Sequence, residues 1–479
     1  MRHSHNFYLY LYYNMASEAM SESLQYANVK RRAVASRSYR TRLPPVNGIT
    51  FAPGGTIQVD LPANLAATYI DMSQCYLKFK VVEDGTAAFN LDRAGAYGFI
   101  RRLQISQAGS QISDLDRMNV LCAAMIDADS SFEWRGSSGK TLVGTETSLR
   151  GERVAAGSSR TYCCPLILNP LSQTTPHRMI PLFSLASLSL RFTMEDVATS
   201  VVSVGVPGIS FQDVELVSML TELSPGAQAM VDSATGGRYD ILATSWAYSG
   251  GQLAAGVTSS TTNLGFSYSS LERVVFAFRP QLSQVAARYS LGNRAVESLS
   301  EYNLLINSQP YPQVPIKREN AGAEALSELL IADHALMDFA KGTAFCNGFT
   351  PAGVAGAVGF GYSLFANINP RAGLIPNDPY NPSTPALGTT AGDAVNLNTD
   401  AATPSDIGTF LASIELESAI SNGKSSHIYS GVSTLASTVQ LVTKHSAAVV
   451  SACTIDAFAN YTILMSLNMR GTGVFSVSV

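Results

Sequence analysis

The sequence predicts an all-β protein built from two β-sandwich domains in tandem, with a few inserted helices. Three observations support this fold class. The chain has 479 residues, more than the ~250 to 300 that one hydrophobic core usually serves. Most segments alternate apolar and polar residues with period two and are rich in Val, Ile, Thr, Phe and Tyr, as half-buried strands are. The order of elements in the first half also recurs in the second.

The predicted strands occur in both halves of the chain. Turn-forming Gly, Pro, Asn or Ser residues bound each of them. The clearest strands are 56–61, 75–82, 100–105, 185–194, 274–278, 302–307, 438–442 and 461–469.

Three segments have helical periodicity and a start signal. The first begins at Ser113, where Asp116 completes an S-x-x-D capping box, and extends over 113–128. The second is short and follows Ser224 as N-cap, with Pro225 at the first helical position. The third begins near Asn320. Sparse helices among many strands are expected of jelly-roll sandwiches.

The two halves repeat one order of elements at an offset of about 200 residues. Strands 75–82 and 100–107 and helix 113–128 recur as strands 271–278 and 302–309 and helix 320–340. The segment LQISQ at 103–107 aligns with LINSQ at 305–309. This order predicts a duplicated domain, with the boundary near 225–237.

Composition favours a large assembly. Apolar residues make up 46% of the chain and charged residues only 14%, against about 25% charged in an ordinary soluble domain. Because charged residues are depleted at interface cores, neighbouring copies are expected to cover much of the surface. A secreted β protein covered by Ser, Thr and Gly is the alternative.

Basic residues are concentrated near the start of the chain. The segment 29–59 contains six cations and no anion, so the remainder is acidic. These cations are Lys30, Arg31, Arg32, Arg37, Arg40 and Arg42. We expect residues 1–47 to form a flexible arm that contacts phosphates or anionic lipid without reading sequence. A solvated tail with no contact is the alternative.

No motif indicates catalysis, a cofactor or a metal. The segment GSSGKT at 136–141 imitates the end of a phosphate loop, but Trp134 occupies the place of the required glycine, so a polar turn is expected. The six histidines form no pair at i, i+4. Asp127, Asp129 and Ser131 have calcium-like spacing without the glycine and closing glutamate, so they predict the C-terminal turn of a helix.

The sequence gives no strong signal for export or for a membrane span. Six cysteines without a C-x-x-C pair are expected to be buried thiols made in a reducing compartment. The opening segment is a poor signal peptide, and Met15 is a second possible start. The uncharged stretch 342–370 is rich in glycine and predicts a loop that runs into a strand.

Three blocks carry a family resemblance. The first is FIRRLQIS at 99–106, running into the helix at 114–125. The second is HRMIPLFSL at 177–185 followed by LSLRFTME at 188–195, and the third is NSQPYPQVP at 307–315 before an Ala/Glu/Leu-rich helix. Their order resembles the double jelly-roll major capsid proteins, a group that includes adenovirus hexon and the shell proteins of virophages, polinton-like viruses and tailless membrane-containing phages.

The resemblance implies two tandem eight-stranded jelly-roll sandwiches with a few inserted helices. The expected division is a flexible basic arm over 1–47, a first jelly-roll over 48–225 and a second over 226–479. The family also implies trimers with a pseudo-hexagonal footprint, an arm that faces inward, and outer towers formed here by loops 342–360 and 374–409.

The implied function is structural and not enzymatic, with no catalytic, cofactor or metal residue. The expected partners are further copies of the chain, first as a homotrimer and then as neighbouring capsomers, together with minor capsid or penton proteins. The arm would contact the genome or an internal membrane. The protein would be made in the host cytoplasm or nucleus and reside in the virion of an icosahedral DNA virus.

Two other function classes stay open. One is a capsid protein of another lineage, with a shell domain and a projecting β domain. The other is a β-sandwich carbohydrate-binding protein or glycoside hydrolase, since paired carboxylates need only be close in space. With two tryptophans in the chain, sugar platforms would have to come from tyrosines, which counts against the second class.

Overall fold

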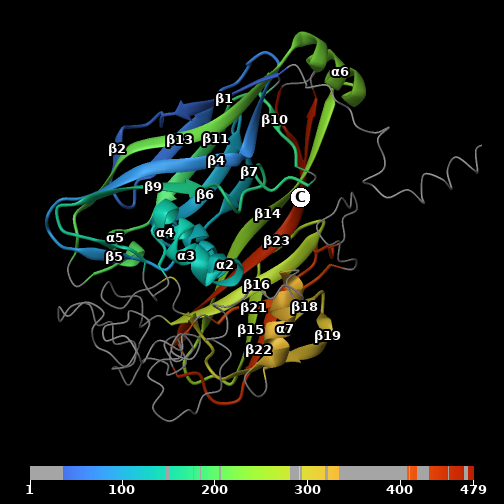
Figure 1. Ribbon diagram of the computed structural model, residues 1–479. Coiled ribbons are helices and arrows are strands. Elements are labelled where there is room, and N and C mark those ends of the chain that lie inside the picture. Colours follow the sequence, from blue (N-terminus) through green and yellow to red (C-terminus); the bar gives the residue numbers. More distant parts are fainter. Residues whose placement is uncertain are drawn as a thin grey trace, which may run out of the picture.

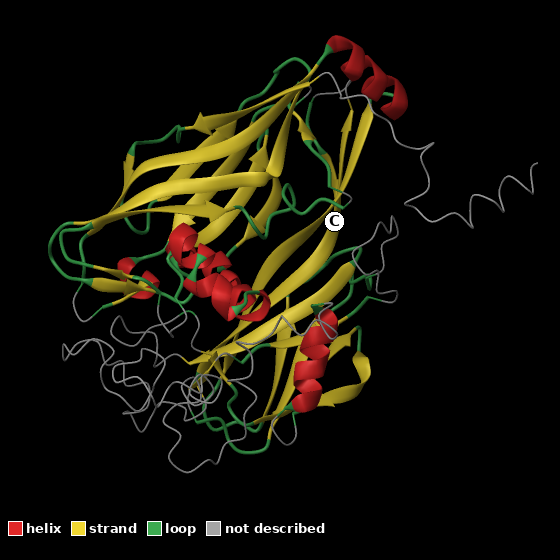
Figure 2. Ribbon diagram, in the orientation of Figure 1, coloured by secondary structure: helices red, strands yellow, loops and turns green. Residues whose placement is uncertain are grey.

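The computed structural model shows two β-sandwiches connected by a helix (Figure 1). It describes residues 36–146, 151–280, 291, 294–318, 322–333, 407–417, 431–468 and 473–479, except 176, 184, 204, 205, 409 and 451. Strands dominate both parts, and helices lie at their margins (Figure 2).

The first sandwich, here called the first roll, contains two antiparallel sheets, each with four main strands. One sheet has the order β1 (Ser36–Leu43), β13 (Ile209–Leu223), β4 (Thr68–Glu83) and β9 (Ser159–Pro165). The other has the order β3 (Thr56–Leu61), β11 (Leu188–Met194), β6 (Ile100–Gln107) and β7 (Ser110–Leu115). Two four-stranded sheets connected in this order form a jelly-roll.

The second sandwich, here called the second roll, repeats this strand order. One sheet is β14 (Arg238–Leu253), β23 (Cys453–Asn468), β16 (Leu271–Pro280) and β21 (Ala412–Glu415). The other is β15 (Ser259–Leu264), β22 (Val439–His445), β18 (Leu299–Ile306) and β19 (Gln309–Lys317). The predicted internal repeat is therefore confirmed by the topology, with β4 and β6 corresponding to β16 and β18.

Short strands extend these sheets or form a third small one. They are β2 (Thr50–Phe51), β5 (Phe89–Leu91), β8 (Arg153–Val154), β10 (Ile180–Pro181), β12 (Val201–Val202), β17 (Arg294–Ala295), β20 (Ile407–Gly408) and β24 (Ser476–Ser478).

Alternating burial explains why period-two patterns located the strands. In β3, Ile57, Val59 and Leu61 are buried and the residues between them are not, as expected when one face of a sheet covers a core. Each of the eight predicted strands coincides with, or overlaps, a strand of the structure.

Aromatic rings fill the centre of the first roll. Phe79 of β4, Phe99 of the 3-10 helix η3 (Ala96–Phe99) and Phe211 of β13 are fully buried. Their ring centroids lie 5.2 to 6.4 Å apart in edge-to-face arrangements, a favoured geometry for aromatic pairs. These contacts tie the two sheets of the roll together.

The structure describes six α-helices. They are α2 (Met118–Asp129), α3 (Phe132–Gly136), α4 (Ser138–Val143), α5 (Val197–Ser200), α6 (Pro225–Thr235) and α7 (Ala323–Ala332). Among the described residues, none of these helices is long and apolar enough to cross a bilayer.

The predicted start of the first helix is wrong. Residues 113–115 belong to strand β7, and the helix begins at Met118 after Arg117, whose φ is +53°. The capping box fails because its members have other partners. The Ser113 hydroxyl lies 3.1 Å from that of Ser245 in the second roll, and Asp116 pairs with Arg101 at 3.3 Å.

Two neighbouring predictions have different outcomes. The polar turn expected over 136–141 is wrong, because these residues lie in the consecutive short helices α3 and α4. The helix after Ser224 is confirmed. The Ser224 hydroxyl accepts a hydrogen bond from the Ala227 amide, Pro225 occupies the first turn, and Gly236 closes the helix with a positive φ.

Part of the predicted arm forms a strand. Residues 36–43 form β1, which pairs along its full length with 216–223 of β13. Residues 1–35 lie outside the described part of the chain, as do the predicted tower loops apart from β20. The third predicted helix starts at Ala323, and its expected continuation beyond Asp333 is likewise outside.

The prediction that the cysteines are buried is confirmed for four of the five described ones. Cys75, Cys122, Cys164 and Cys453 are buried, Cys163 is half-buried, and none of these five described cysteines is in a disulfide. Burial raises the pKa of the Cys75 thiol to about 12, so this group is unreactive near neutral pH. Cys346 lies outside the described residues.

Candidate functional site

The two rolls meet at a buried junction that contains helix α2 (Figure 1). Eleven of the twelve residues of α2 are buried. An amphipathic surface helix would leave one face in water. The second roll therefore completes an environment that the first roll alone does not provide.

Asp127 of α2 is the centre of this junction. Its carboxylate accepts hydrogen bonds from Arg93 at 2.7 Å, from Arg135 at 2.5 Å and from Arg294 at 2.6 Å. All four side chains are at most 2% exposed. Burial alone would raise the pKa of Asp127, but the three guanidinium groups outweigh it and hold the pKa well below its usual range.

Arg93 and Arg294 occupy corresponding places in the two repeats. Each closely follows a leucine, Leu91 or Leu291, and each directly precedes an alanine. The two segments also touch directly, since the Leu291 amide donates to the Asp92 carboxylate at 2.7 Å. An arginine from each roll thus reaches the same aspartate.

Backbone hydrogen bonds join the rolls beside this cluster. The Thr175 amide donates to the Leu242 carbonyl at 2.9 Å, and the Thr244 amide donates to the Gln173 carbonyl at 3.0 Å. A segment of the first roll therefore pairs with the outer edge of β14. This edge would otherwise present unpaired backbone groups.

The segment that begins at Gly473 returns to the first roll. The side-chain amide of the buried Gln107 donates through its nitrogen to the Gly473 carbonyl and accepts through its oxygen from the Phe475 backbone amide, both at 2.8 Å. The Ala186 amide also donates to Gly473, at 2.7 Å. The second roll is thus attached to the first at more than one point.

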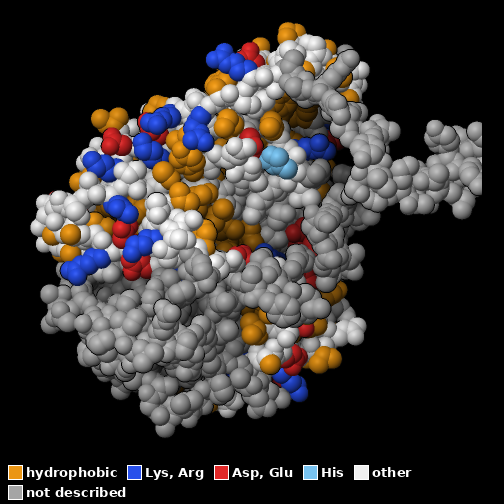
Figure 3. Space-filling view, viewed as in Figure 1, with side chains coloured by type: hydrophobic (Ala, Val, Ile, Leu, Met, Phe, Trp, Pro, Cys, Tyr) orange, Lys and Arg blue, Asp and Glu red, His pale blue; other side chains and the backbone are white. Residues whose placement is uncertain are grey.

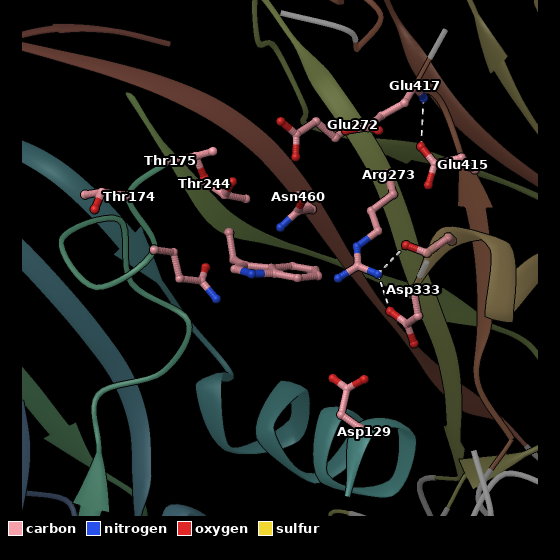
Figure 4. Close-up of a pocket in the computed structure, with 13 residues that line it drawn as sticks. Asp129, Thr174, Thr175, Thr244, Glu272, Arg273, Asp333, Glu415, Glu417 and Asn460 are labelled. Carbon is pink, nitrogen blue, oxygen red and sulfur yellow. Dashed lines mark hydrogen bonds and ion pairs between the residues drawn. The ribbon is translucent and has the colours of Figure 1, made fainter. Parts of the chain in front are cut away.

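A polar cavity of about 370 Å³ lies between the rolls (Figure 4). Arg273 lies 5.1 Å from the centre of the buried Trp246 ring, donates to the Ala332 carbonyl at 2.7 Å and pairs with Asp333. Four other carboxylates line the cavity. The lining residues are Asp129, Gln173, Thr174, Thr175, Thr244, Trp246, Glu272, Arg273, Ala332, Asp333, Glu415, Glu417 and Asn460.

The carboxylates of this cavity do not form a metal site. Within the described ranges, no group of three His, Cys, Asp or Glu side chains is placed to hold an ion. One of the carboxylates, that of Glu415, has a pKa near neutral pH. Burial raises the pKa of Glu415 to about 7, the Glu417 carboxylate adds to the shift, and Arg273 opposes it.

The raised pKa of Glu415 predicts a pH-dependent stability. Between about pH 4.5 and about pH 7, Glu415 keeps its proton in the folded chain but has lost it in the unfolded chain. The free energy of unfolding should therefore fall by roughly 2 kcal/mol over this interval as the pH rises. Glu415→Gln should remove this decline, which urea unfolding at pH 5 and pH 8 measures. An equal decline in the variant and the wild type would contradict the assignment.

The structure describes three of the six predicted arm cations, and these three do not lie on one side of a strand. Lys30, Arg31 and Arg32 lie outside the described residues. Arg37 lies on one side of β1, 5.5 Å from the Tyr39 ring centre, whereas Arg40 and Arg42 lie on the other. Arg42 pairs with Glu215 at 3.4 Å while 65% of its side chain stays exposed. On the visible face, Lys and Arg alternate with Asp and Glu (Figure 3).

Sequence reasoning missed the Asp127 cluster. The predicted C-terminal turn of a helix is confirmed, because Asp127 and Asp129 both lie in the last turn of α2. The sequence did not indicate that Asp127 is completely buried among arginines. The signal available in the sequence was the repeated Leu and Arg-Ala pattern around Arg93 and Arg294.

The comparisons connect this fold with viral shells. No family model and no curated protein matches the chain. The Faustovirus major capsid protein matches in structure with a TM-score of 0.57, 8% identity, and coverage of 94% of this chain and 93% of that one. VP54 of PBCV-1, in the form fitted into a reconstruction of the virophage Sputnik, matches with a TM-score of 0.56, 11% identity and coverage of 95% and 99%.

The mavirus major capsid protein also matches, with a TM-score of 0.50, 10% identity, and coverage of 96% of this chain and 95% of that chain. Each likeness extends over both rolls, and the two rolls repeat one strand order. The protein therefore has the double jelly-roll fold that these viral capsid proteins share.

Proposed function

We propose that the protein is a major capsid protein, a structural subunit that assembles into trimeric, pseudo-hexameric capsomers of an icosahedral DNA virus. The observation that carries this proposal is the likeness to viral capsid proteins over nearly the full length of both chains. The low charge of the chain supports it, because subunit contacts deplete charged residues.

The two alternatives have less support. A capsid protein with one shell domain and one projecting domain would not need two rolls of identical strand order, which this chain has. A carbohydrate-binding protein or hydrolase has no counterpart among the solved structures described above. We propose two assembly domains that meet at α6, which separates β13 from β14. The first extends beyond the predicted 48–225 to include β1, because β1 pairs with β13.

The mass of the purified protein in solution tests the proposal. Light scattering over a range of concentrations should give three times the monomer mass, or larger shells in equilibrium with it. A monomer that persists at every concentration would contradict the capsid function and favour a screen of sugars.

We also propose that the basic arm contacts the viral genome or an internal membrane. Lys30, Arg31 and Arg32 precede β1 and carry three positive charges, and such charges release counterions when they meet phosphates. The remaining proposed partners are neighbouring capsomers and minor capsid or penton proteins. The proposed location is the virion, after synthesis in the host cytoplasm or nucleus.

Alanine at Lys30, Arg31 and Arg32 together should weaken binding to duplex DNA or to anionic vesicles while trimers persist. For DNA, the slope of log affinity against log salt should fall by up to about 3. Titrations of each probe with wild type and variant distinguish the two partners. Unchanged binding to both probes would refute the role of the arm.

A further inference from the structure

Helix α6 turns its polar side toward the protein. It lies at one end of the molecule (Figure 1), and none of its eleven residues is buried. Its one charged residue is Asp232, whose carboxylate accepts hydrogen bonds from the Tyr239 hydroxyl and the Gln228 side-chain amide, both at 2.7 Å. The Gln228 side chain in turn accepts a hydrogen bond from the Tyr69 hydroxyl at 3.0 Å. A surface helix usually has its charged residues on the side that faces water, so α6 is reversed.

The outer face of α6 is exposed and carries no charge. Its exposed residues come in pairs that recur every four positions, so they lie on one side of the helix. They are Pro225, Gly226, Ala229, Met230, Ser233 and Ala234. Met230 is the largest of them, and 75% of it is exposed. Single exposed apolar residues are common, but a whole exposed helix face without a charge suits a partner less polar than water.

The basic arm joins the fold beside this face. Ser36 begins β1 and pairs with Leu223, which directly precedes the N-cap of α6. The cations at 30–32 lie within six residues of Ser36, so they are at most about 20 Å from it, close to the ~16 Å length of α6. Arg238 follows the other end of α6, and 63% of its side chain is exposed. Positive charge therefore adjoins both ends of the uncharged face.

Cations outnumber acids around α6. The acids next to it in sequence are Glu222 and Asp240, and Asp232 lies within it. Arg37 is exposed and pairs in register with Glu222 across β1 and β13. With Arg37, Arg238 and the three arm cations, five positive charges stand against three negative ones. This end of the molecule therefore attracts a surface that is both apolar and anionic.

We infer that α6 lies against an anionic lipid bilayer, where its uncharged face enters the headgroup region and the adjoining cations bind the lipid phosphates. The inference rests on the proposed role of the arm, and it selects a membrane over the genome as the partner. Helices that lie in a membrane interface combine an apolar face with flanking basic residues. The phosphates of duplex DNA would attract the same cations but would offer Met230 no apolar surface.

Substitutions on the uncharged face test this contact without altering charge. Met230→Gln keeps a good helix former but removes the apolar side chain. It should weaken binding to vesicles of phosphatidylcholine and phosphatidylserine at least fivefold, and leave the affinity for duplex DNA unchanged. Ala229→Leu/Ala234→Leu enlarges the same face and should strengthen vesicle binding at least tenfold. Because this variant gains binding, unfolding cannot imitate its effect. Co-sedimentation with vesicles measures both changes.

The matched control is Val314→Gln on β19, where the side chain is 70% exposed and lies in the second roll, so vesicle binding should not change. Vesicle affinities that agree within twofold for the wild type and both α6 variants would overturn the contact but leave the role of the arm standing. A wild type that binds DNA and not vesicles would overturn the inference and make the genome the partner. A wild type that binds neither would overturn the role of the arm as well, while light scattering decides the capsid function separately.

Discussion

Replacing Asp127 by asparagine should lower the free energy of unfolding by about 3 to 5 kcal/mol. The change leaves the guanidinium groups of Arg93, Arg135 and Arg294 buried without their common counter-charge. Asparagine has nearly the same shape as aspartate, so lost packing contributes little to the effect. Equilibrium unfolding in urea, followed by circular dichroism, measures it.

Asp116→Asn is the matched control, because Asp116 pairs with Arg101 at the surface, where the side chains are 32% and 40% exposed. This change should cost less than about 1 kcal/mol, as exposed ion pairs usually do. The argument for a central role of Asp127 fails if the two variants unfold at the same urea concentration.

Replacing Trp246 by alanine should have a similar cost, about 3 to 5 kcal/mol. Trp246 is 2% exposed and lies on β14, where the rolls meet. Its removal leaves a void and deprives Arg273 of the ring over which it lies. Thermal unfolding of variant and wild type, compared at one pH, measures the loss.

The control for Trp246 is Met230→Ala on α6, where the side chain is 75% exposed and should contribute within about 0.5 kcal/mol. The chain has two tryptophans, so Trp246→Phe leaves Trp134 as the sole indole reporter. A Trp246→Ala variant as stable as Met230→Ala would show that the junction does not depend on this ring.

Local sequence patterns predicted most of the strands and helix α6, because side-chain alternation and helix capping depend on residues close together in the chain. In β3, every second side chain faces the core, so Ile57, Val59 and Leu61 show the strand directly. Helix α6 was equally predictable, since Ser224 and Pro225 act on the backbone of the next turn. Neither prediction required knowledge of the partner roll.

The failures occurred where a distant residue decides the local structure. Ser113 satisfies a helix signal, yet it lies in β7 and contacts Ser245, 132 residues further along. Asp127 lies in the last turn of a helix, as predicted, but its pairing with Arg294, 167 residues away, was not predicted. Arg37 and Arg40 belong to a basic segment, yet backbone pairing with β13 makes that part of the segment a strand.

The pairing of Asp127 with arginines from both rolls also has a consequence for folding during synthesis. A ribosome makes α2 well before Arg294, and domains generally fold from the first-made end. Asp127 can therefore pair with Arg93 and Arg135 while the second roll is still being synthesised. Arg294 then enters a pocket whose negative charge is already in place. We therefore expect the first roll to fold before the second, and Arg294 to pair with Asp127 only when the second roll folds.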